Sequence, residues 1–383
     1  MGYFIYFFQI AAFVLVFSYG YVILKRLYAW RNIPEIQVPE TDIPQTFISI
    51  IIPVRNEEVN IRSLLLNLEA QTYPHQLIEI LIIDDDSEDN TGALVQDFAR
   101  SATFPVHYKH LKQYSDKSGK KAAVQIGITK ACGELMVLTD GDCRVQPGWL
   151  QHIEYLYRQK QAKFISGLVC YDAPASVFEK IQLVEFAALI GVGAGSLALK
   201  QPNMCNGANI AYPKYVFNEV KGFAGNEHIS SGDDEFLMHK IFQLYPEAVH
   251  TLKSPAAVVY TAAKTQVSDF FAQRVRWASK WPAYTDIKIK LLAVLVFNLN
   301  FFILISFGLF VFHFISGLNF VLVFGTKCLI DLWFLKPILS FFQKQRYWLY
   351  VIPLQFIYIP YVVITALAAL RGAYNWKGRS IKT

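Results

Sequence analysis

The chain has few of the residues that build disulfide frameworks or zinc sites. Its 383 residues include five cysteines, and none of them stands in a C-x-x-C pair or beside a histidine at metal-ligand spacing. Neither a disulfide-stapled fold nor a zinc site is therefore predicted. A reducing, cytosolic compartment is the simpler expectation for the soluble part.

Two glycine-rich phosphate loops are also missing. No G-x-G-x-x-G follows the first strand pattern, and no G-x-x-x-x-G-K-[ST] occurs in the chain. These loops hold the phosphates of dinucleotides in dehydrogenases and of nucleoside triphosphates in P-loop enzymes. Their absence argues against both classes and leaves a nucleotide site that holds a diphosphate through a carboxylate-bound metal.

Basic runs are absent as well. The formal net charge is +6, but no Lys/Arg run and no basic-aromatic stripe occurs. No nucleic-acid partner is therefore predicted, and a basic membrane protein more often meets anionic lipid headgroups.

Apolar residues, by contrast, make up 54% of the chain and collect at its two ends. The stretch from Tyr3 to Leu24 carries no charge and is long enough to cross a bilayer, so residues 1–26 are predicted to be a membrane anchor. Lys25, Arg26 and Arg31 follow directly. By the positive-inside rule the N-terminus is expected outside and the catalytic domain in the cytoplasm, at the plasma or inner membrane.

The C-terminal end is apolar again. Leu291–Phe314 and Val351–Leu370 are predicted spans, and Leu318–Leu335 is a weaker one because Lys327 and Asp331 lie inside it. These two charges stand one helical turn apart and are expected to pair.

The number of C-terminal spans decides where the tail lies. Three spans within residues 289–371 leave the basic tail, residues 372–383, outside, against the positive-inside rule. Two spans with a re-entrant middle segment would place it inside. About three spans are predicted.

Between the ends, strand and helix patterns alternate, as in a parallel sheet with crossover helices. Residues 45–263 are therefore predicted to form one α/β domain. The expected strands are residues 47–54, 78–83, 105–111 and 134–139, and the expected helices are residues 60–70, 90–100 and 119–131.

Two acidic clusters follow buried strand patterns, Asp84-Asp85-Asp86 and Asp140-Gly141-Asp142. Ligands of open α/β sheets bind at the carboxyl ends of the strands, where both clusters are expected to lie. Carboxylates on a tight turn suit a hard cation whose shell is completed by substrate phosphates. Asp140 and Asp142 are therefore predicted to hold Mg²⁺ or Mn²⁺.

For two further segments the sequence allows both a structural and a functional interpretation. Ser231-Gly232-Asp233-Asp234 precedes a helical pattern, so its acids either cap the helix or supply a general base to an acceptor hydroxyl. Gln273-Arg274-Val275-Arg276-Trp277 lies in a predicted interfacial helix, residues 264–288, among aromatic residues that include Trp281. Its arginines offer planar donors to phosphate.

The segments that carry this chemistry follow one another in a definite order. They are IPVRNEE at 52–58, IDDDSED at 83–89, Gly119-Lys120, Asp140-Gly141-Asp142, Gly232-Asp233-Asp234, and Gln273, Arg276 and Trp277 in a Q-x-x-R-W pattern. In this order they resemble glycosyltransferase family 2 over about residues 47–285. The family comprises inverting membrane enzymes of GT-A fold, including cellulose, chitin and hyaluronan synthases and ceramide glucosyltransferase. The chain departs from its pattern at Arg55, where Tyr is usual, at Asp86, where Gly is common, and at Gly232-Asp233, where the family has Thr-Glu.

The resemblance implies a role for each matched residue. Asp234 takes the position of the general base, and Asp140 and Asp142 that of the metal ligands. The donor nucleotide is assigned to Pro53, Asn56, Glu57, Asp85, Asp89, Lys120 and Asp140. The acceptor and diphosphate side is assigned to Gln273, Arg276, Trp277, Asn206 and Gly207; the last two also fit an ordinary turn in which Asn and Gly supply positive φ.

The implied protein is a membrane-bound hexosyltransferase: a GT-A nucleotide-sugar-binding α/β domain flanked by transmembrane helices. It would move a sugar with inversion from a nucleotide sugar, a UDP-sugar, to a lipid, glycolipid or glycan at the cytoplasmic membrane face, with a divalent metal. An accessory export protein would be a further partner. A processive polysaccharide synthase, a membrane nucleotidyltransferase and a non-catalytic membrane subunit are the alternatives, and the small number of spans favours a single transfer.

Overall fold

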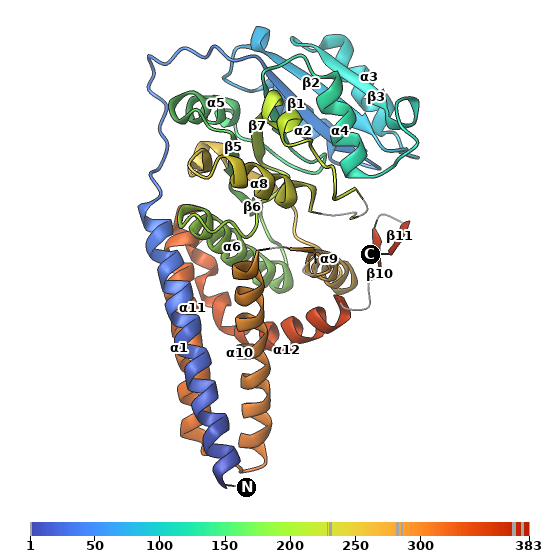
Figure 1. Ribbon diagram of the computed structural model, residues 1–383. Coiled ribbons are helices and arrows are strands. Elements are labelled where there is room, and N and C mark those ends of the chain that lie inside the picture. The colour runs from blue at the N-terminus through green and yellow to red at the C-terminus, as the bar shows by residue number, and fades with distance from the viewer. Residues whose placement is uncertain are drawn as a thin grey trace. The chain divides into compact units, whose positions relative to one another are not determined.

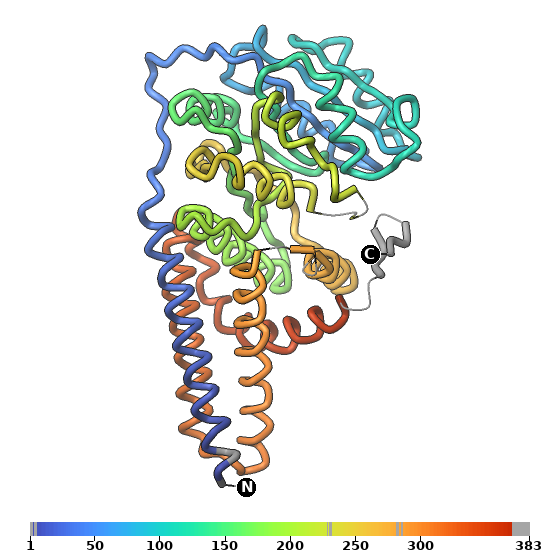
Figure 2. Tube along the Cα trace, in the orientation of Figure 1, coloured from blue at the N-terminus to red at the C-terminus, as the bar shows by residue number. Residues whose placement is uncertain are grey.

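The computed structural model describes residues 2–227, 229, 232–280, 283, 284, 286–369, 373–376 and 379–382 (Figure 2). Ser231 and Trp281 lie outside these ranges. So do residues 372, 377, 378 and 383 of the predicted tail. The chain forms two compact units. A helical unit comprises Met1–Asn32, Pro174–Gly195 and Ala263–Thr383, and a sheet unit comprises Ile33–Ala173 and Ser196–Ala262.

The sheet unit is built on seven strands in the order β3-β2-β1-β4-β7-β5-β8 (Figure 1). β3, β2, β1 and β4 are parallel neighbours, whereas β7 pairs antiparallel with both β4 and β5, and β5 pairs parallel with β8. The strands are β1 (Ile48–Val54), β2 (Ile78–Asp84), β3 (Val106–His110), β4 (Leu135–Leu138), β5 (Phe164–Gly167), β7 (Ile210–Pro213) and β8 (Val249–Leu252); β6 (Val169–Tyr171) and β9 (Val259–Thr261) form a separate parallel pair. The predicted α/β class is confirmed, and the antiparallel strand β7 was not predicted.

Apolar strands explain why this sheet forms. β1 and β2 are almost wholly buried and rich in isoleucine, whose branched side chains suit a pleated surface covered on both faces. Helix α4 (Lys120–Lys130) can lie close to the sheet because Gly127 has no side chain: a methyl group there would lie 2.6 Å from Ile51. The sheet unit also carries α2 (Ile61–Glu69), α3 (Thr91–Ser101), α4 (Lys120–Lys130), α5 (Trp149–Lys160), α7 (Lys214–Glu219) and α8 (Asp233–Leu244).

Strand register brings the two predicted acidic clusters to one edge. Val54 at the end of β1 pairs with Asp84 at the end of β2, and β4 runs parallel to β1 on its other side. The turns after these three strands therefore leave the sheet together, at the edge where open α/β sheets bind ligands.

The helical unit contains long apolar helices. Five helices of the described residues are long and apolar enough to cross a membrane: Tyr6–Asn32, Val177–Ala198, Ile287–Val311, Gly317–Phe341 and Gln345–Ala369. They correspond to α1 (Gly2–Asn32), α6 (Val177–Ala198), α10 (Ile287–Val311), α11 (Gly317–Phe341) and α12 (Val351–Ala369), and α9 (Val267–Ala278) and a hairpin of β10 (Ala373–Trp376) and β11 (Arg379–Lys382) complete the unit. Of the apolar window of α6, 78% is buried, so this helix is mostly core.

The charges inside α11 pair as predicted. Lys327 is fully buried and its ammonium lies 2.9 Å from the carboxylate of Asp331. Tyr19 of α1 donates to Asp331 at 2.5 Å, and Lys327 also donates to Gln355 of α12. The pair therefore ties three helices together rather than facing lipid.

Helix α12 differs in direction from the other C-terminal helices. Figure 1 shows it running crosswise to α1, α10 and α11, which lie along one another. The middle segment α11 is a continuous helix of 25 residues, with no sign of a re-entrant turn. All three predicted C-terminal segments are thus helical and long enough to cross a membrane, and α12 runs crosswise to the other two.

Candidate active site

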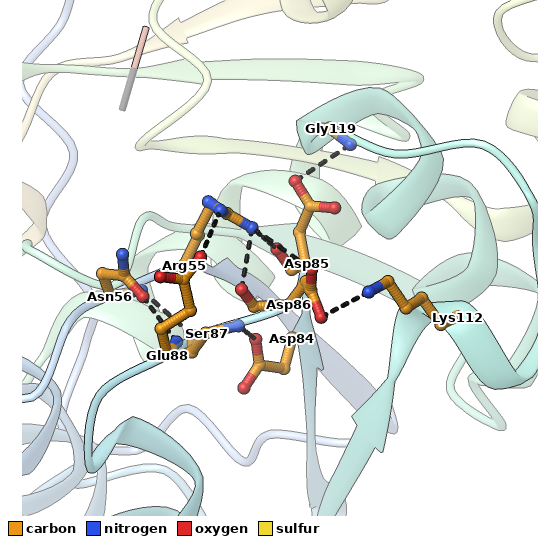
Figure 3. Close-up of polar contacts among 9 residues, drawn as sticks. All are labelled: Arg55, Asn56, Asp84, Asp85, Asp86, Ser87, Glu88, Lys112 and Gly119. Carbon is orange, nitrogen blue, oxygen red and sulfur yellow. Dashed lines mark hydrogen bonds and ion pairs between the residues drawn. The ribbon is translucent and has the colours of Figure 1, made fainter. Parts of the chain in front are cut away.

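The turns after β1 and β2 interlock through backbone and side-chain hydrogen bonds (Figure 3). The amide of Asn56 donates to the hydroxyl of Ser87 at 2.9 Å, and the amide of Glu88 donates back to the side-chain oxygen of Asn56 at 2.9 Å. Asp84 accepts from the amide of Ser87 at 2.8 Å and from Tyr108 at 2.5 Å. The predicted donor-side turns are therefore joined into one hydrogen-bonded structure.

The side chain of Arg55 also connects the turn after β1 to the turn after β2. Its guanidinium donates to the backbone oxygens of Asp85 at 2.6 Å and Asp86 at 2.7 Å, and lies 3.3 Å from Glu88. Asp86 has a φ of 68°, the left-handed conformation that a glycine adopts most easily, and its carboxylate lies 2.7 Å from Lys112. Two of the departures from the family pattern, Arg55 and Asp86, are thus in direct contact.

Asp85 and Asp89 take different positions. Asp85 is buried and accepts the backbone N–H of Gly119 at 3.0 Å, which links the β2 turn to the start of α4. Asp89 accepts from Thr91 and from the amide of Glu58 at 3.0 Å. Burial would raise the pKa of Asp89, but these hydrogen bonds outweigh it and lower that pKa, so Asp89 remains an anion that ties the turns together.

The other two predicted donor residues of the β1 turn are Pro53 and Glu57. Pro53 is the half-buried penultimate residue of β1. Glu57 is buried, its amide donates to Thr91 at 2.8 Å, and its carboxylate accepts from Asn60 at 3.0 Å. Both lie in the same interlocked structure as Asn56.

At the end of β4, Asp140 forms an ion pair with Lys120, the first residue of α4. Asp142 is exposed, one residue beyond Gly141. Burial, together with the charges of Asp142 and Asp140, raises the pKa of the Cys143 thiol well above its usual range, so this sulfur stays protonated. The donors offered here are carboxylate oxygens, the ligands that Mg²⁺ and Mn²⁺ prefer.

These residues fit a divalent cation whose shell is completed by substrate. Among the described residues, no group of three or more His, Cys, Asp or Glu side chains is arranged to hold a metal. Two carboxylates are sufficient when diphosphate oxygens and water supply the remaining ligands.

The start of α8 brings the predicted base to the same place. Asp234 accepts the backbone N–H of Gly207 at 2.6 Å. A methyl group on Gly207 would lie 3.2 Å from the ammonium of Lys120 and 3.3 Å from Asp234. Asp234, Gly207 and Lys120 therefore lie within a few ångströms of one another, around the cation that also pairs with Asp140.

The Asn206-Gly207 loop is not a turn with positive φ, since neither residue has one. Instead, Asn206 accepts the amide of Ala208 at 3.0 Å with its side chain. This closure of the loop aims the amide of Gly207 at Asp234. The acids of α8 occupy its first turn, where the helix dipole favours them, but the N-cap residue is Gly232 and makes no side-chain cap hydrogen bond.

Charge in this cluster is balanced by a lysine. Burial alone would lower the pKa of Lys120, but the carboxylates of Asp140, Asp233 and Asp234 outweigh it and raise that pKa. Burial also raises the pKa of Asp233, against the opposing charge of Lys120. Lys120 is therefore a cation throughout the neutral range, and Asp233, which sequence reasoning did not assign, belongs to the cluster.

The Q-x-x-R-W residues belong to the helical unit. Gln273, Arg276 and Trp277 stand three and four residues apart on α9, which places them on one face of the helix, and all three are half-buried. Their part in the site is a prediction from the motif.

Comparisons with known proteins agree on a family. The family model described as Glycosyl transferase family 2 matches residues 49–184. The model described as Glycosyl transferase family group 2 matches residues 135–369, and this second match alone covers more than half of the chain. The chain is 34% identical to glycosyltransferase AglE of Haloferax volcanii over 107 residues, which are 27% of this chain and 33% of the relative. It is 25% identical to poly-beta-1,6-N-acetyl-D-glucosamine synthase of Staphylococcus epidermidis over 235 residues, 60% of this chain and 53% of the relative.

These matches cover only part of the length of each relative. A third relative, the probable glycosyltransferase YdaM of Bacillus subtilis, is 22% identical over 65% of this chain and 58% of its own length. The chain therefore spans less than two thirds of each of these relatives. Among solved structures, the mannosyltransferase PcManGT from Pyrobaculum calidifontis, in complex with GDP-Man and Mn²⁺, superposes with a TM-score of 0.60. That likeness covers 90% of this chain and 97% of the other at 18% identity, and it shows the fold.

Proposed function

The chain belongs to glycosyltransferase family 2 and is a transferase of GT-A fold, and we propose that it moves a sugar with inversion from a UDP-sugar to a lipid or glycan acceptor. The observation that carries the proposal is the cluster around Lys120. One cation there contacts Asp140 on the predicted donor side and lies beside Asp234 on the predicted acceptor side. A group transfer between two substrates requires the donor-binding and acceptor-binding residues to lie close together.

Asp234 is the proposed general base. In an inverting transfer the acceptor hydroxyl loses its proton to a carboxylate as its oxygen forms a bond to the anomeric carbon, while the bond from that carbon to the diphosphate breaks. Asp234 is partly exposed, and the N–H of Gly207 holds one of its oxygens in place. The carboxylate is thus partly accessible and held in one orientation, close to the ammonium of Lys120.

Lys120 and Arg276 are the proposed cations for the departing diphosphate. The ammonium of Lys120 keeps its charge, and Lys120 would exchange its partner Asp140 for the diphosphate when the donor binds. A cation fixed in advance where negative charge develops lowers the barrier without reorganising the site. A divalent metal held by Asp140 and Asp142 would supply further charge neutralisation to the same diphosphate.

Donor recognition is assigned to the interlocked turns. Pro53, Asn56, Glu57, Asp85 and Asp89 belong to this structure or hold it together. The structure of similar fold holds GDP-Man and Mn²⁺. GDP-sugars are therefore the donors to test beside the UDP-sugars proposed here.

The orientation of α12 supports a cytoplasmic site and an inside tail. With the N-terminus outside, α1 enters, α10 leaves and α11 returns, so an α12 that lies in the membrane plane leaves the tail on the cytoplasmic side. This arrangement satisfies the positive-inside rule at both ends of the chain. We propose it in place of three C-terminal spans.

A processive synthase is the second candidate. Relatives named poly-beta-1,6-N-acetyl-D-glucosamine synthase match 60% of this chain. With α12 in the membrane plane, only α1, α10 and α11 remain as full-length spans of the described chain, which are few to line a polymer channel. A single transfer therefore stays the preferred proposal.

Product analysis tests the proposal. Membranes containing the protein are incubated with Mn²⁺ and a panel of UDP- and GDP-sugars, and the lipids and glycans are examined by mass spectrometry beside membranes that lack it. One added hexose from a UDP-sugar is expected. A ladder of additions would support the processive synthase, a product from GDP-sugars alone would overturn the donor assignment, and no product from any donor would contradict the function.

A further inference from the structure

The motif helix α9 carries a second arginine, Arg274, between the residues of the Q-x-x-R-W pattern. Its side chain is 3% exposed and pairs with Glu185 of α6, which is equally buried. Two nitrogens of the guanidinium reach two carboxylate oxygens, Nε to Oε1 at 3.2 Å and Nη2 to Oε2. A buried ion pair needs such complete geometry to offset the loss of hydration, and the planar fork of arginine provides it.

The same guanidinium contacts two motif residues. Its Nη1 donates to the amide oxygen of Gln273 at 2.6 Å, and its centre lies 4.4 Å from the ring of Trp277. Because the oxygen of Gln273 is engaged in this way, the side chain offers its NH₂ group to a ligand. The contact over Trp277 restricts the orientation of the ring, which also lies beside Phe186.

A third helix completes the arrangement. Tyr361 of α12 donates its hydroxyl to Glu185 Oε1 at 3.0 Å, and its ring packs against Phe270 and Phe271 of α9. Glu185 is therefore held from α9 and from α12 at once, within the helical unit. An ion pair that only stabilised the bundle would need no contact with either motif residue.

We propose that Arg274 is a positioning residue for sugar transfer: it orients the amide of Gln273 and the ring of Trp277, and Glu185 and Tyr361 hold Arg274 in place. The inference rests on the proposed function, since it takes the Q-x-x-R-W residues to act in the transfer. It adds to that function a layer of residues outside the matched motif, on α6 and α12.

The test compares Arg274→Lys with Arg274→Met. Lysine keeps a cation beside Glu185, so the variant is expected to fold, but it lacks the fork that reaches Glu185 and Gln273 together. Transfer is measured with the radiolabelled UDP-sugar that gives product in membranes, and rates are divided by the number of UDP sites counted by calorimetry in Mn²⁺. We expect kcat per site to fall about tenfold in Arg274→Lys and further in Arg274→Met. The KM for the UDP-sugar and the Kd for UDP should stay within about twofold.

Two tyrosines provide a matched pair. Tyr361→Phe removes the hydroxyl on Glu185, and Tyr19→Phe removes a comparable buried hydroxyl on Asp331, away from the motif helix. Only Tyr361→Phe is expected to lower kcat per UDP site, by a few-fold. This pair also decides the matter if Arg274→Lys yields no protein that binds UDP.

The outcomes separate this inference from the proposed function. Absence of transfer by the unmodified protein would contradict the function itself. Transfer by the unmodified protein with unchanged kcat per site in Arg274→Lys would overturn the positioning role alone. Equal losses in Tyr361→Phe and Tyr19→Phe, or a fall in UDP affinity that parallels the fall in kcat, would also overturn it.

Discussion

At the scale of single residues, the donor-side turn shows how two substitutions compensate each other. Asp86 adopts a left-handed conformation with a φ of 68°, in which a residue other than glycine is strained by about 1 kcal/mol. Arg55 donates to the backbone oxygens on both sides of that strained peptide, at 2.6 and 2.7 Å. The guanidinium holds the turn in a shape that a glycine would adopt on its own.

Arg55→Ala is therefore expected to loosen the turn. The side chain is 9% exposed and makes two short charged hydrogen bonds, so its loss should lower stability by about 2 kcal/mol and weaken UDP binding. Lys112→Ala is the control, because that ion pair with Asp86 is 74% exposed on the lysine side and contributes little. Thermal unfolding and UDP titration measure both. Equal effects of the two changes would contradict this account of Arg55.

Asp142→Asn tests the proposed metal ligands. It follows Asp140 on the β4 turn and is exposed, so the amide should leave the fold intact and remove one of two anionic oxygen ligands. Transfer is expected to fall by at least about a hundredfold in Mn²⁺ at unchanged thermal stability. Full activity of the variant, or undiminished activity of the unmodified protein in excess EDTA, would remove the metal from the account.

Which site residues could be predicted depended on their backbone position. Asp140, Asp142 and Asp234 could be proposed as site residues because they follow strands or open a helix, which sequence patterns reveal. Asp233 was missed because its membership rests on burial and on its nearness to Lys120, which no local pattern shows. Arg274 was read as part of the motif segment, but its partner Glu185 lies 89 residues away in the chain.

At the scale of elements, the predicted strands and helices of the sheet unit agree with the structure to within a few residues. β1 was predicted at 47–54 and is found at Ile48–Val54, because a buried run of isoleucine has few alternatives to a covered strand. The antiparallel strand β7 could not be predicted in the same way. Its pairing with β4 joins segments about 75 residues apart, and four buried residues do not reveal a direction.

The start of α4 depends on a glycine. Gly119 has a φ of 95°, and its N–H donates to Asp85 at 3.0 Å. A methyl group there would meet nothing within 4 Å among the described residues, so Gly119→Ala adds backbone strain alone, about 1–2 kcal/mol. We expect lower stability together with weaker UDP binding.

Gly225→Ala is its matched control. That glycine has a φ of 84° and equally open surroundings within the described residues, and it lies in the loop after α7. A similar loss of thermal stability with normal UDP affinity is expected. If both variants lost UDP affinity alike, the link from Asp85 to Gly119 would have no part in nucleotide binding.

At the scale of the whole molecule, hydropathy located α1, α10, α11 and α12 but not their directions, and it did not single out the mostly buried α6. Both α10 and α12 are long and apolar enough to cross a membrane, yet Figure 1 shows α12 crosswise to α10. The difference arises from tertiary contacts, because α12 buries Gln355 and Tyr361 against Lys327 and Glu185. Such polar contacts are invisible to a sum of apolar residues.

Reporter fusions test the resulting topology. A reporter after Arg31 and one at the C-terminus are both expected to read cytoplasmic, since α1, α10 and α11 cross the membrane and α12 lies in its plane. A fusion in the segment between α10 and α11 should read the opposite side. An outside reading at the C-terminus alone would make α12 a span, and an outside reading after Arg31 would reverse the whole orientation.

The central claim is that one cluster around Lys120 combines a donor side at Asp140 with a base at Asp234, and calorimetric titration with UDP and Mn²⁺ tests it most directly. Asp234→Asn should bind UDP with near-normal affinity while its transfer rate falls by roughly 10²-fold or more, the scale of a positioned general base. Asp140→Asn should instead lose UDP affinity in the same buffer. If Asp234→Asn lost UDP binding as severely as Asp140→Asn, the assignment of Asp234 as the base would be wrong, and that carboxylate would belong to the donor site.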